Sequence, residues 1–510
     1  MADSARRVEP GSRRFALAGR PFGHTIDEPM NPAGKLIKVL MRVMAMGISL
    51  PLVARADAVD DRIAKLMESR GVPGVSIAVF DAGAIVKARG YGVVEAGLSE
   101  PVSIGTLFQA GSVSKPVAAV GALRLVEDGR LTLDGDVNAH LKAWKVPENE
   151  LTREEKVTLR RILSHSAGLT VKGFPGYASE RVAAGVLQIL DGAPPANTQP
   201  VRVEAVPGSR TMYSGGGYLV MQQMAAEAAG VPFAAYMRSR VLAPLGMSAS
   251  AFEQPLPAML AGRAASGHRL GRVPRVLEGR WFVHPELAAA GLWTTPTDLA
   301  KFAMAVQDAQ AGGAGAILGK EVAGEMLTRQ SGNQGLGWVI AGDGPLKRFE
   351  HGGRNAGFDT QLVAYVSGGR GAVVMMNANE NAGMMARILE AIAEQYSWPG
   401  YPVRKPAVAI EDDAPQVSAV LRRVIERFAD GGALDDIATA KLTGEVAPHR
   451  ARIREDFLEY GALKKIERVQ AAKDDGPGVH RHRLTFERAT MLVRSEISDG
   501  RIDSISARPE

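Results

Sequence analysis

The first regular pattern of apolar residues along the chain has the period of a helix, and the next has the period of a strand. Residues 59–70 carry apolar side chains three and four positions apart, which predicts a helix that ends at the Gly- and Pro-containing turn 71–74. The runs 75–81 and 84–91 are typical of β-strands and are separated only by Ala82-Gly83. These two runs therefore predict a β-hairpin.

The middle of the chain changes to helical spacing, and the strand pattern returns only afterwards. Between about 107 and 291 the pattern predicts helices joined by Pro and Gly, and a further helix at 297–307 has Asp298 at a capping distance. Helices are predicted at 159–163, 217–229 and 232–241, strands at 335–341, 348–351, 361–367 and 371–377, and a closing helix at 384–396.

Strands at both ends of a helical block predict an α+β fold. We expect one antiparallel sheet, assembled from distant segments and flanked by helices, with an inserted helical subdomain over about 107–291. Closure over such a long range creates a cleft between the sheet and the subdomain, and loops at such a junction usually bind substrates. The predicted domain covers residues 57–400.

The C-terminal stretch has a pattern of its own. Residues 401–415 contain prolines and an acidic cluster, which predicts a linker. Beyond it we expect helices at 417–428 and 449–460 and strands at 463–471, 479–487, 490–498 and 501–507, with Asp499-Gly500 as a hairpin turn. Residues 416–510 are therefore predicted to form a small α+β domain, whose layout resembles that of NTF2-like domains.

Residues 1–56 have the pattern of a leader, or signal peptide. A basic segment at 35–42 precedes an apolar run at 43–53 that is too short to span a bilayer as a stable helix. Ala54-Arg55-Ala56 supplies a small-x-small cleavage site, so we expect processing after Ala56. The pattern predicts a secreted or periplasmic protein with no stable membrane span after processing. An uncleaved amphipathic helix or membrane anchor is the alternative.

Composition and charge narrow the possible functions. The 510 residues include 46% hydrophobic side chains, ample for a large core, and no cysteine, which excludes disulfides, thiolate metal sites and cysteine nucleophiles. Of 61 Lys and Arg and 55 Asp and Glu, the first 56 residues hold nine and four, so the remainder is nearly neutral. No basic patch with interleaved aromatics indicates nucleic-acid binding. The nine histidines are scattered, and neither His-Glu-x-x-His nor a Walker loop occurs, so we expect no metal and no cofactor.

Ser112 and Lys115 stand just before a run, 117–126, that is apolar on nearly every face and is followed by Asp128-Gly129. This pattern predicts a loop that leads into a buried helix. Residues three apart project from one face of a helix, which brings the hydroxyl and the amine within hydrogen-bonding reach. Burial and the helix dipole can lower the pKa of the lysine, whose amine can then take the serine proton. The alternative is a capping serine and a solvated lysine.

Two further stretches carry candidate chemistry. Tyr213 lies two residues before three consecutive glycines, which can display it from a tight loop, and a phenol near a lysine ammonium is a candidate proton shuttle. His351 ends a predicted strand and precedes Gly352-Gly353, where a substrate can lie along the strand edge and a backbone N–H can donate to an oxyanion. The alternatives are a flexible loop with core tyrosines and a hydrogen-bonded structural histidine.

Taken in this order, the three stretches resemble the serine β-lactamase and penicillin-binding-protein superfamily, and most of all its class C β-lactamase-like serine hydrolases. The resemblance covers about residues 58–398 and includes supporting segments at 159–169, 207–208 and 290–299. It implies that Ser112 is the acylated nucleophile, that Lys115 accepts its proton, and that Tyr213 is the general acid/base.

The same resemblance assigns roles on the predicted strand. It gives His351 the place of the family's lysine and Gly353 that of its glycine, and it implies an oxyanion hole made of the backbone N–H groups of Ser112 and Arg354. His165 is implied to support the fold. The histidine is mostly neutral near pH 7, and Gly215 stands where the family has asparagine, so the chain departs from a dedicated β-lactamase.

The sequence therefore predicts a serine hydrolase that acts through a covalent acyl-enzyme on a small-molecule or peptide ester or amide, of the esterase or peptidase type. The Gly-x-Ser-x-Gly elbow of α/β-hydrolases does not occur. A β-lactamase or D-alanyl-D-alanine carboxypeptidase is the alternative within the family. A non-catalytic ligand-binding protein on the same fold is the alternative of another class. The sequence predicts no particular oligomeric state.

Overall fold

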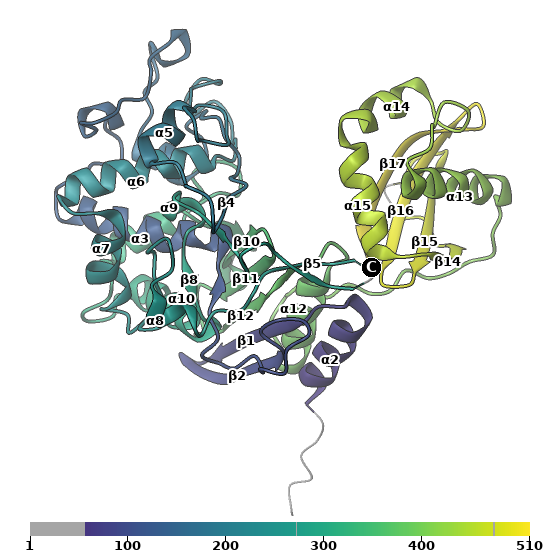
Figure 1. The fold of residues 1–510 in the computed structure, drawn as a ribbon, viewed down its shortest axis with the longest axis horizontal. Helices are drawn as coiled ribbons and strands as arrows, with labels where there is room; N and C mark the ends of the chain where they lie inside the picture. Colours follow the sequence, from purple (N-terminus) through teal and green to yellow (C-terminus); the bar gives the residue numbers. More distant parts are fainter. Residues whose placement is uncertain (1–56, 272, 473–474) are drawn as a thin grey trace, which may run out of the picture. The chain divides into compact units, whose positions relative to one another are not determined.

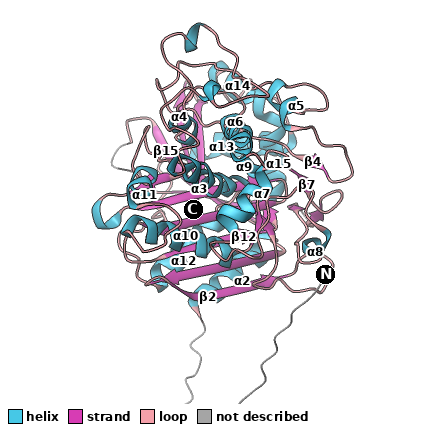
Figure 2. Cartoon of the chain, turned by 90° about the vertical axis from the view of Figure 1, so that its left-hand side faces the viewer, coloured by secondary structure: helices cyan, strands magenta, loops and turns pink. Residues whose placement is uncertain are grey.

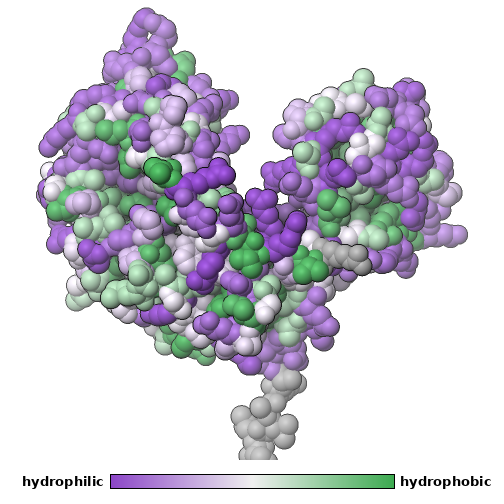
Figure 3. Space-filling view, in the orientation of Figure 1, coloured by the Kyte–Doolittle hydropathy of each residue, from purple (hydrophilic) through white to green (hydrophobic). Residues whose placement is uncertain are grey.

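The computed structural model describes residues 57–271, 273–472 and 475–510. The predicted leader and its cleavage after Ala56 lie outside the described residues. Among the residues that are described, no helix is both long and apolar enough to cross a membrane. On the face seen in Figure 3, hydrophilic side chains dominate and apolar ones form small separate groups, as on an ordinary protein surface.

The largest sheet has six antiparallel strands in the order β2-β1-β12-β11-β10-β9. The strands are β1 (Gly74–Asp81), β2 (Ala84–Gly92), β9 (Val339–Ala341), β10 (Arg348–Asn355), β11 (Phe358–Tyr365) and β12 (Gly371–Met376). Strand β1 pairs with β12 so that Val75 lies opposite Met376. The predicted sheet of distant segments is therefore confirmed, and the predicted hairpin is β1-β2.

Alternate residues of β1 enter two different cores, because successive side chains of a strand point to opposite faces. Val75 and Val79 pack with helices α2 (Ala58–Arg70) and α12 (Met384–Gln395), both near their predicted bounds. Phe80 belongs to the larger core of the helical part. Figure 1 shows α2 and α12 on one side of the sheet and α3, α6 and α9 on the other. Figure 2 shows the strands crossing between these helices.

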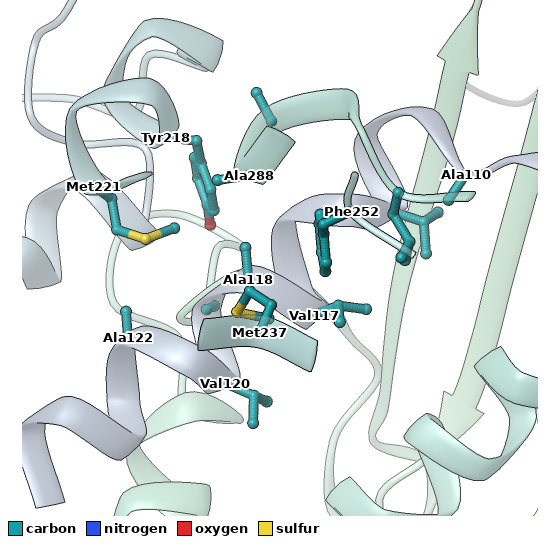
Figure 4. Packing of buried hydrophobic residues seen from close by; sticks show 14 of the residues in the cluster. Ala110, Val117, Ala118, Val120, Ala122, Tyr218, Met221, Met237, Phe252 and Ala288 are labelled. Atoms are coloured by element: carbon teal, nitrogen blue, oxygen red, sulfur yellow. The ribbon is translucent and has the colours of Figure 1, made fainter. Parts of the chain in front are cut away.

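The helical part surrounds one largely buried helix, α3 (Ser114–Glu127). Figure 4 shows Val117, Ala118 and Ala122 of α3 among Met237 and Tyr218 from neighbouring helices. The other helices here are α4 (Leu159–Leu163), α5 (Val186–Asp191), α6 (Gly215–Ala229), α7 (Phe233–Met237), α8 (Ala258–Ala261), α9 (Leu287–Ala290), α10 (Pro296–Ala311) and α11 (Lys320–Met326). The helix predicted at 232–241 is α7 continued by a π-helical turn, Arg238–Leu242. Because α3 is apolar on nearly every face, it serves as the centre of the core.

Several short strands were not predicted. Strand β3 (Phe108–Gln109) pairs with β8 (Trp293–Thr294), β4 (Tyr177–Ala178) pairs with β7 (Phe282–Val283), and β5 (His268–Arg269) lies between β6 (Arg275–Val276) and β13 (Ala378–Asn379). Two residues are too few to display a period, so only tertiary pairing reveals these strands.

The predicted bounds of three strands in the main sheet need correction. The strand expected at 335–341 forms only at Val339–Ala341, because Gly337, with φ +90°, lies in a bend of the backbone. The strand expected to end at 351 continues as β10 to Asn355, through both glycines. The strand expected at 361–367 runs from Phe358 to Tyr365. Glycine weakens an isolated strand, and here pairing with β11 outweighs that weakness.

The C-terminal part has four antiparallel strands in the order β14-β15-β16-β17. They are β14 (Leu463–Arg468), β15 (Val479–Phe486), β16 (Thr490–Ser498) and β17 (Arg501–Pro509), accompanied by α13 (Pro415–Asp430), α14 (Ala440–Val446) and α15 (Arg450–Tyr460). Helix α14 was not predicted. Asp499 and Gly500 both have positive φ, +50° and +73°, which confirms the predicted hairpin turn. Leu421, Val493 and Ile502 belong to a core of this part.

Candidate active site

Ser112 lies in the middle of a helical turn, Gly111–Val113, that leads directly into α3. The Ser114 hydroxyl fixes this turn, since it donates to the Gly111 carbonyl at 2.6 Å and accepts from the Leu292 amide at 3.0 Å. Gly111 has φ +51°, a left-handed conformation that favours glycine. The backbone before α3 thus holds Ser112 at the end of a rigid buried helix.

The Lys115 side chain is buried, with 2% of its surface exposed. Its Nζ donates to the Ser112 hydroxyl oxygen at 3.0 Å and to the Ala289 carbonyl of α9 at 2.8 Å. The predicted pairing of hydroxyl and amine is therefore present, and the solvated lysine is ruled out. The Ala289 carbonyl is a partner that the sequence reasoning missed, because a four-residue helix shows no period.

Tyr213 joins the same group through its ring. Lys115 Nζ lies 5.1 Å from the centre of the Tyr213 ring and 5.5 Å from that of Tyr218, distances typical of cation–π contacts. The adjacent Ser214 caps the start of α6, since its hydroxyl accepts from the Gly217 amide at 2.9 Å. Tyr213 and Ser112 line one cleft. The glycine-rich stretch is thus the capped start of a helix and not a flexible loop. Tyr218 is packed in the core, as the alternative interpretation of this stretch expected.

His165 supports the Tyr213 loop. Its Nδ1 accepts from the Ser214 amide at 3.1 Å, and its ring centre lies 4.1 Å from that of Tyr213. Burial, with the nearby charge of Lys115, holds the pKa of His165 well below its usual range. A neutral imidazole in this place can accept the amide hydrogen bond, which agrees with the structural role implied for His165.

His351 is a neutral histidine at the opposite side of the cleft. Burial first, and the charge of Lys115 second, lower the pKa of His351 to about 4. Its Nδ1 lies 2.7 Å from the Gly352 carbonyl oxygen. Because a carbonyl can only accept, Nδ1 carries the proton, and Nε2 is left as an acceptor.

Strand β10 lies against the turn that carries Ser112. A Cβ atom at Gly353 would lie 2.0 Å from the Ala110 carbonyl oxygen and 3.0 Å from the Ser112 nitrogen. A Cβ atom at Gly111 would lie 2.5 Å from the Arg354 nitrogen. Only glycine fits at either position. This contact brings the Ser112 and Arg354 amides close together. They are the pair implied to form an oxyanion hole.

The side chain of Arg354 is engaged on the other face of β10. Its guanidinium donates to both carboxylate oxygens of Asp359, each at 2.6 Å, and to Asn381 Oδ1 at 2.6 Å. Asn355, on the Gly353 face, donates to Gln109 Oε1 at 2.7 Å and to the Ala290 carbonyl at 3.0 Å. Sequence reasoning missed both sets of contacts, since their partners lie in distant segments.

The cleft that Ser112 and Tyr213 line has a volume of about 780 Å³, within the usual range for small-molecule sites. His351, Gly353 and Arg354 line it as well, so the six residues singled out from the sequence all meet around it, with Lys115 buried behind Ser112. The arrangement offers a hydroxyl with an amine at hydrogen-bonding distance, a phenol, and two backbone amides close together.

The sequence matches the family model described as Beta-lactamase over residues 59–397. Esterase EstB of Burkholderia gladioli is 32% identical over 215 residues, which cover 40% of this chain and 53% of that protein. A β-lactamase of Yersinia enterocolitica is 26% identical over 294 residues, 56% of this chain and 69% of that protein. The match thus spans only about half the length of the esterase.

Solved structures share the fold. The octameric penicillin-binding protein homologue from Pyrococcus abyssi superposes with a TM-score of 0.55 at 19% identity, over 89% of this chain and 98% of that one. At this identity the likeness establishes the fold alone.

Proposed function

Since the chain belongs to the β-lactamase family, we propose that it is a serine hydrolase in which Ser112 forms a covalent acyl-enzyme with an ester or amide. Family membership, predicted from the three stretches, and the α+β fold, predicted from the order of strand and helix patterns, are confirmed. A hydrolase is what the esterase and β-lactamase relatives lead us to expect. The observation that carries the proposal is the 3.0 Å contact between Lys115 Nζ and the Ser112 hydroxyl.

In the proposed acylation, which starts from the free-amine form of Lys115, Ser112 Oγ attacks the carbonyl carbon of the substrate while Lys115 Nζ accepts the hydroxyl proton. The negative charge that develops on the substrate oxygen is stabilised by the Ser112 and Arg354 amides. Tyr213 passes a proton to the leaving alcohol or amine as the carbonyl reforms. Water then attacks the acyl-enzyme with Tyr213 as the base, and the carboxylic acid leaves as Ser112 regains its proton.

His351 favours an uncharged substrate group at its side of the cleft. With a pKa of about 4, its imidazole is neutral at pH 7. The family's lysine, whose place the resemblance gives to His351, carries a charge suited to a carboxylate. We therefore propose esters, and amides without a carboxylate at this point, as the preferred substrate class. The β-lactamase and D-alanyl-D-alanine carboxypeptidase activities are the alternatives.

The proposal is tested with Ser112→Ala and a matched control, Ser367→Ala, which changes an exposed serine. We expect wild type and Ser367→Ala to hydrolyse a p-nitrophenyl ester and to be labelled by an active-serine phosphonate. Ser112→Ala should lose at least about 1,000-fold in rate and all labelling, because the covalent path is gone. Hydrolysis by Ser112→Ala at the wild-type rate would contradict the proposal, and unlabelled wild-type protein would favour a non-catalytic ligand-binding protein.

The substrate class is tested by turnover of a short-chain ester, a chromogenic cephalosporin and a D-amino-acid peptide in parallel. The ester should have the highest kcat/KM. A higher value for the cephalosporin or the peptide would assign the protein to the corresponding alternative.

We further propose that residues 1–56 are a signal peptide, so that the mature protein begins at Asp57 and is secreted or periplasmic. The basic, apolar and small-residue order of this segment supports the proposal. We also propose the division into a hydrolase domain at 57–400, a linker at 401–415 and a small domain at 416–510. The separate apolar core of α13 to β17 supports that division.

A further inference from the structure

Strand β10 is held from two sides at the point where it meets Ser112. On one side, Asn355 is bonded to Gln109 and to the Ala290 carbonyl within the helical part. On the other side, Arg354 is bonded to Asp359, to Asn381 and, at 2.9 Å, to the Glu380 carbonyl. The Arg354 nitrogen lies 2.5 Å from where a Cβ atom at Gly111 would be, so the side chain that anchors this residue also places its amide.

Asn381 connects this anchor to helix α15 of the C-terminal part. Its backbone amide donates to Glu459 Oε1 at 3.0 Å, and its Nδ2 donates to Glu459 Oε2 at 3.0 Å and to Asp456 Oδ1 at 2.9 Å. Its Oδ1 accepts from Arg354. The backbone amide and the whole side chain of Asn381 are therefore used, one end by α15 and the other by Arg354.

The loop around Asn381 is itself tightly held. Glu380 is buried, and its carboxylate accepts from the Ala382 and Met384 amides, each at 2.8 Å, at the start of α12. The Glu380 amide donates to Asp359 Oδ2 at 3.0 Å. On the α15 side, Arg488 donates to the Glu459 carbonyl at 2.6 Å. An unbroken series of hydrogen bonds therefore connects α15 to β10 through Asn381 and Arg354.

Burial disfavours the charged form of these carboxylates. It raises the pKa of Glu459 to about 7, with Glu380 and Asp456 adding to the effect, while it also raises the pKa of Glu380. The charged groups around Glu459 are the carboxylates of Glu380 and Asp456 and the guanidinium groups of Arg70 and Arg354. Buried polar clusters beside an active site commonly hold the reacting groups in position.

We propose that Glu459 and Asp456 of α15 are positioning residues for the hydrolase, because they hold Asn381 and through it Arg354, whose amide faces the nucleophile turn. The C-terminal part is then a component of the oxyanion side of the active site. This inference rests on the proposed function, since it assigns a task to the amide that the proposed chemistry uses.

The experiment compares Glu459→Ala with Glu455→Ala, a matched change of an exposed glutamate on the same helix. In Glu459→Ala we expect kcat for a p-nitrophenyl ester to fall about 10-fold while KM changes less than about 2-fold, since the displaced amide acts mainly in the transition state. Labelling of Ser112 by the phosphonate should slow by a similar factor, because the tetrahedral adduct needs the same amide. Glu455→Ala should behave as wild type in both assays.

Two further variants keep the test decisive if Glu459→Ala folds poorly. Asn381→Leu keeps a similar volume but removes the bonds to Arg354 and α15, and should reproduce the loss in kcat. Glu459→Gln keeps one acceptor oxygen and should restore part of the rate. All rates are taken at least 15 degrees below each variant's Tm.

A fall in Tm with kcat and labelling rate unchanged would overturn the inference, since that is the signature of a purely structural contact. Ser112→Ala is run beside these variants. If it is inactive and Glu459→Ala and Asn381→Leu both keep the wild-type kcat, only this inference fails. If Ser112→Ala keeps the wild-type rate, the proposed function fails, and the inference with it.

Discussion

The two sides of the active-site cleft are built differently. One side, the helical wall, consists of Ser112, Lys115 and Tyr213, and the Lys115 amine contacts both of the other side chains. The other side, the strand wall, consists of His351, Gly353 and the backbone of Arg354. It contributes backbone amides and leaves room for a substrate. A Cβ atom is not tolerated at Gly353. The helical wall should therefore be sensitive to changes of functional groups, and the strand wall to changes of shape.

The largest effect is expected on the helical wall, from Lys115→Met. Methionine keeps a similar length but cannot accept the Ser112 proton, so kcat/KM for an ester should fall about 1,000-fold, within the range for general-base loss. The control is Lys405→Met at an exposed position, which should leave kcat/KM unchanged. Steady-state kinetics at pH 7 provide the measurement. A loss below 10-fold in Lys115→Met would remove Lys115 from the proposed role.

The strand wall should respond to a single methyl group. In Gly353→Ala the new Cβ would overlap the Ala110 carbonyl oxygen at 2.0 Å, so β10 must move from Ser112, and kcat/KM should fall about 100-fold. In Gly352→Ala, on the same strand, the first atom met is Gln361 Oε1 at 2.8 Å, the end of a flexible side chain, and the loss should stay below about 3-fold.

This prediction is checked by measuring steady-state kinetics and Tm of both glycine variants. Equal losses in Gly353→Ala and Gly352→Ala would mean that the close approach of β10 to Ser112 does not control the rate.

The smallest effect on the rate is expected from His351→Gln, because a neutral imidazole and an amide are both uncharged. The larger change should appear in stability. The pKa of His351 is about 4 in the folded state, below the 6.5 expected when unfolded, so the unfolded state takes up the proton first as pH falls. Wild type should therefore lose about 2 kcal/mol more stability than His351→Gln between pH 7 and pH 5.

Urea unfolding of wild type and His351→Gln at the two pH values measures this difference. The other histidines are common to both proteins, so their contributions cancel. Identical pH dependence would show that His351 is not buried as a neutral group.

Local patterns were informative where an element is long and its surroundings uniform. Helix α3 was predicted from a run that is apolar on nearly every face, and the structure buries every residue of that helix from Ser114 to Leu123. Strand β10 shows the opposite case. Its prediction ended at His351 because glycines weaken strands, whereas the structure continues it to Asn355, paired with β11.

The sequence also predicted only some of the contacts in the candidate active site. Ser112 and Lys115 are three residues apart, so helical geometry alone predicted their contact. The Ala289 carbonyl that holds Lys115 and the Asn381 side chain that holds Arg354 could not be predicted in this way. Both are bonded across segments whose spacing along the chain carries no period.

By itself, the sequence determined the kinds of chemical groups available, the helical spacing of Ser112 and Lys115, and the family, because these follow from residue identity and local order. The tertiary structure alone decided that Tyr213 and His351 border the same cleft and that β10 lies within touching distance of Ser112. The physical reason is that closure of a sheet from segments some 300 residues apart is set by burial and pairing of the whole chain, which no short pattern reports.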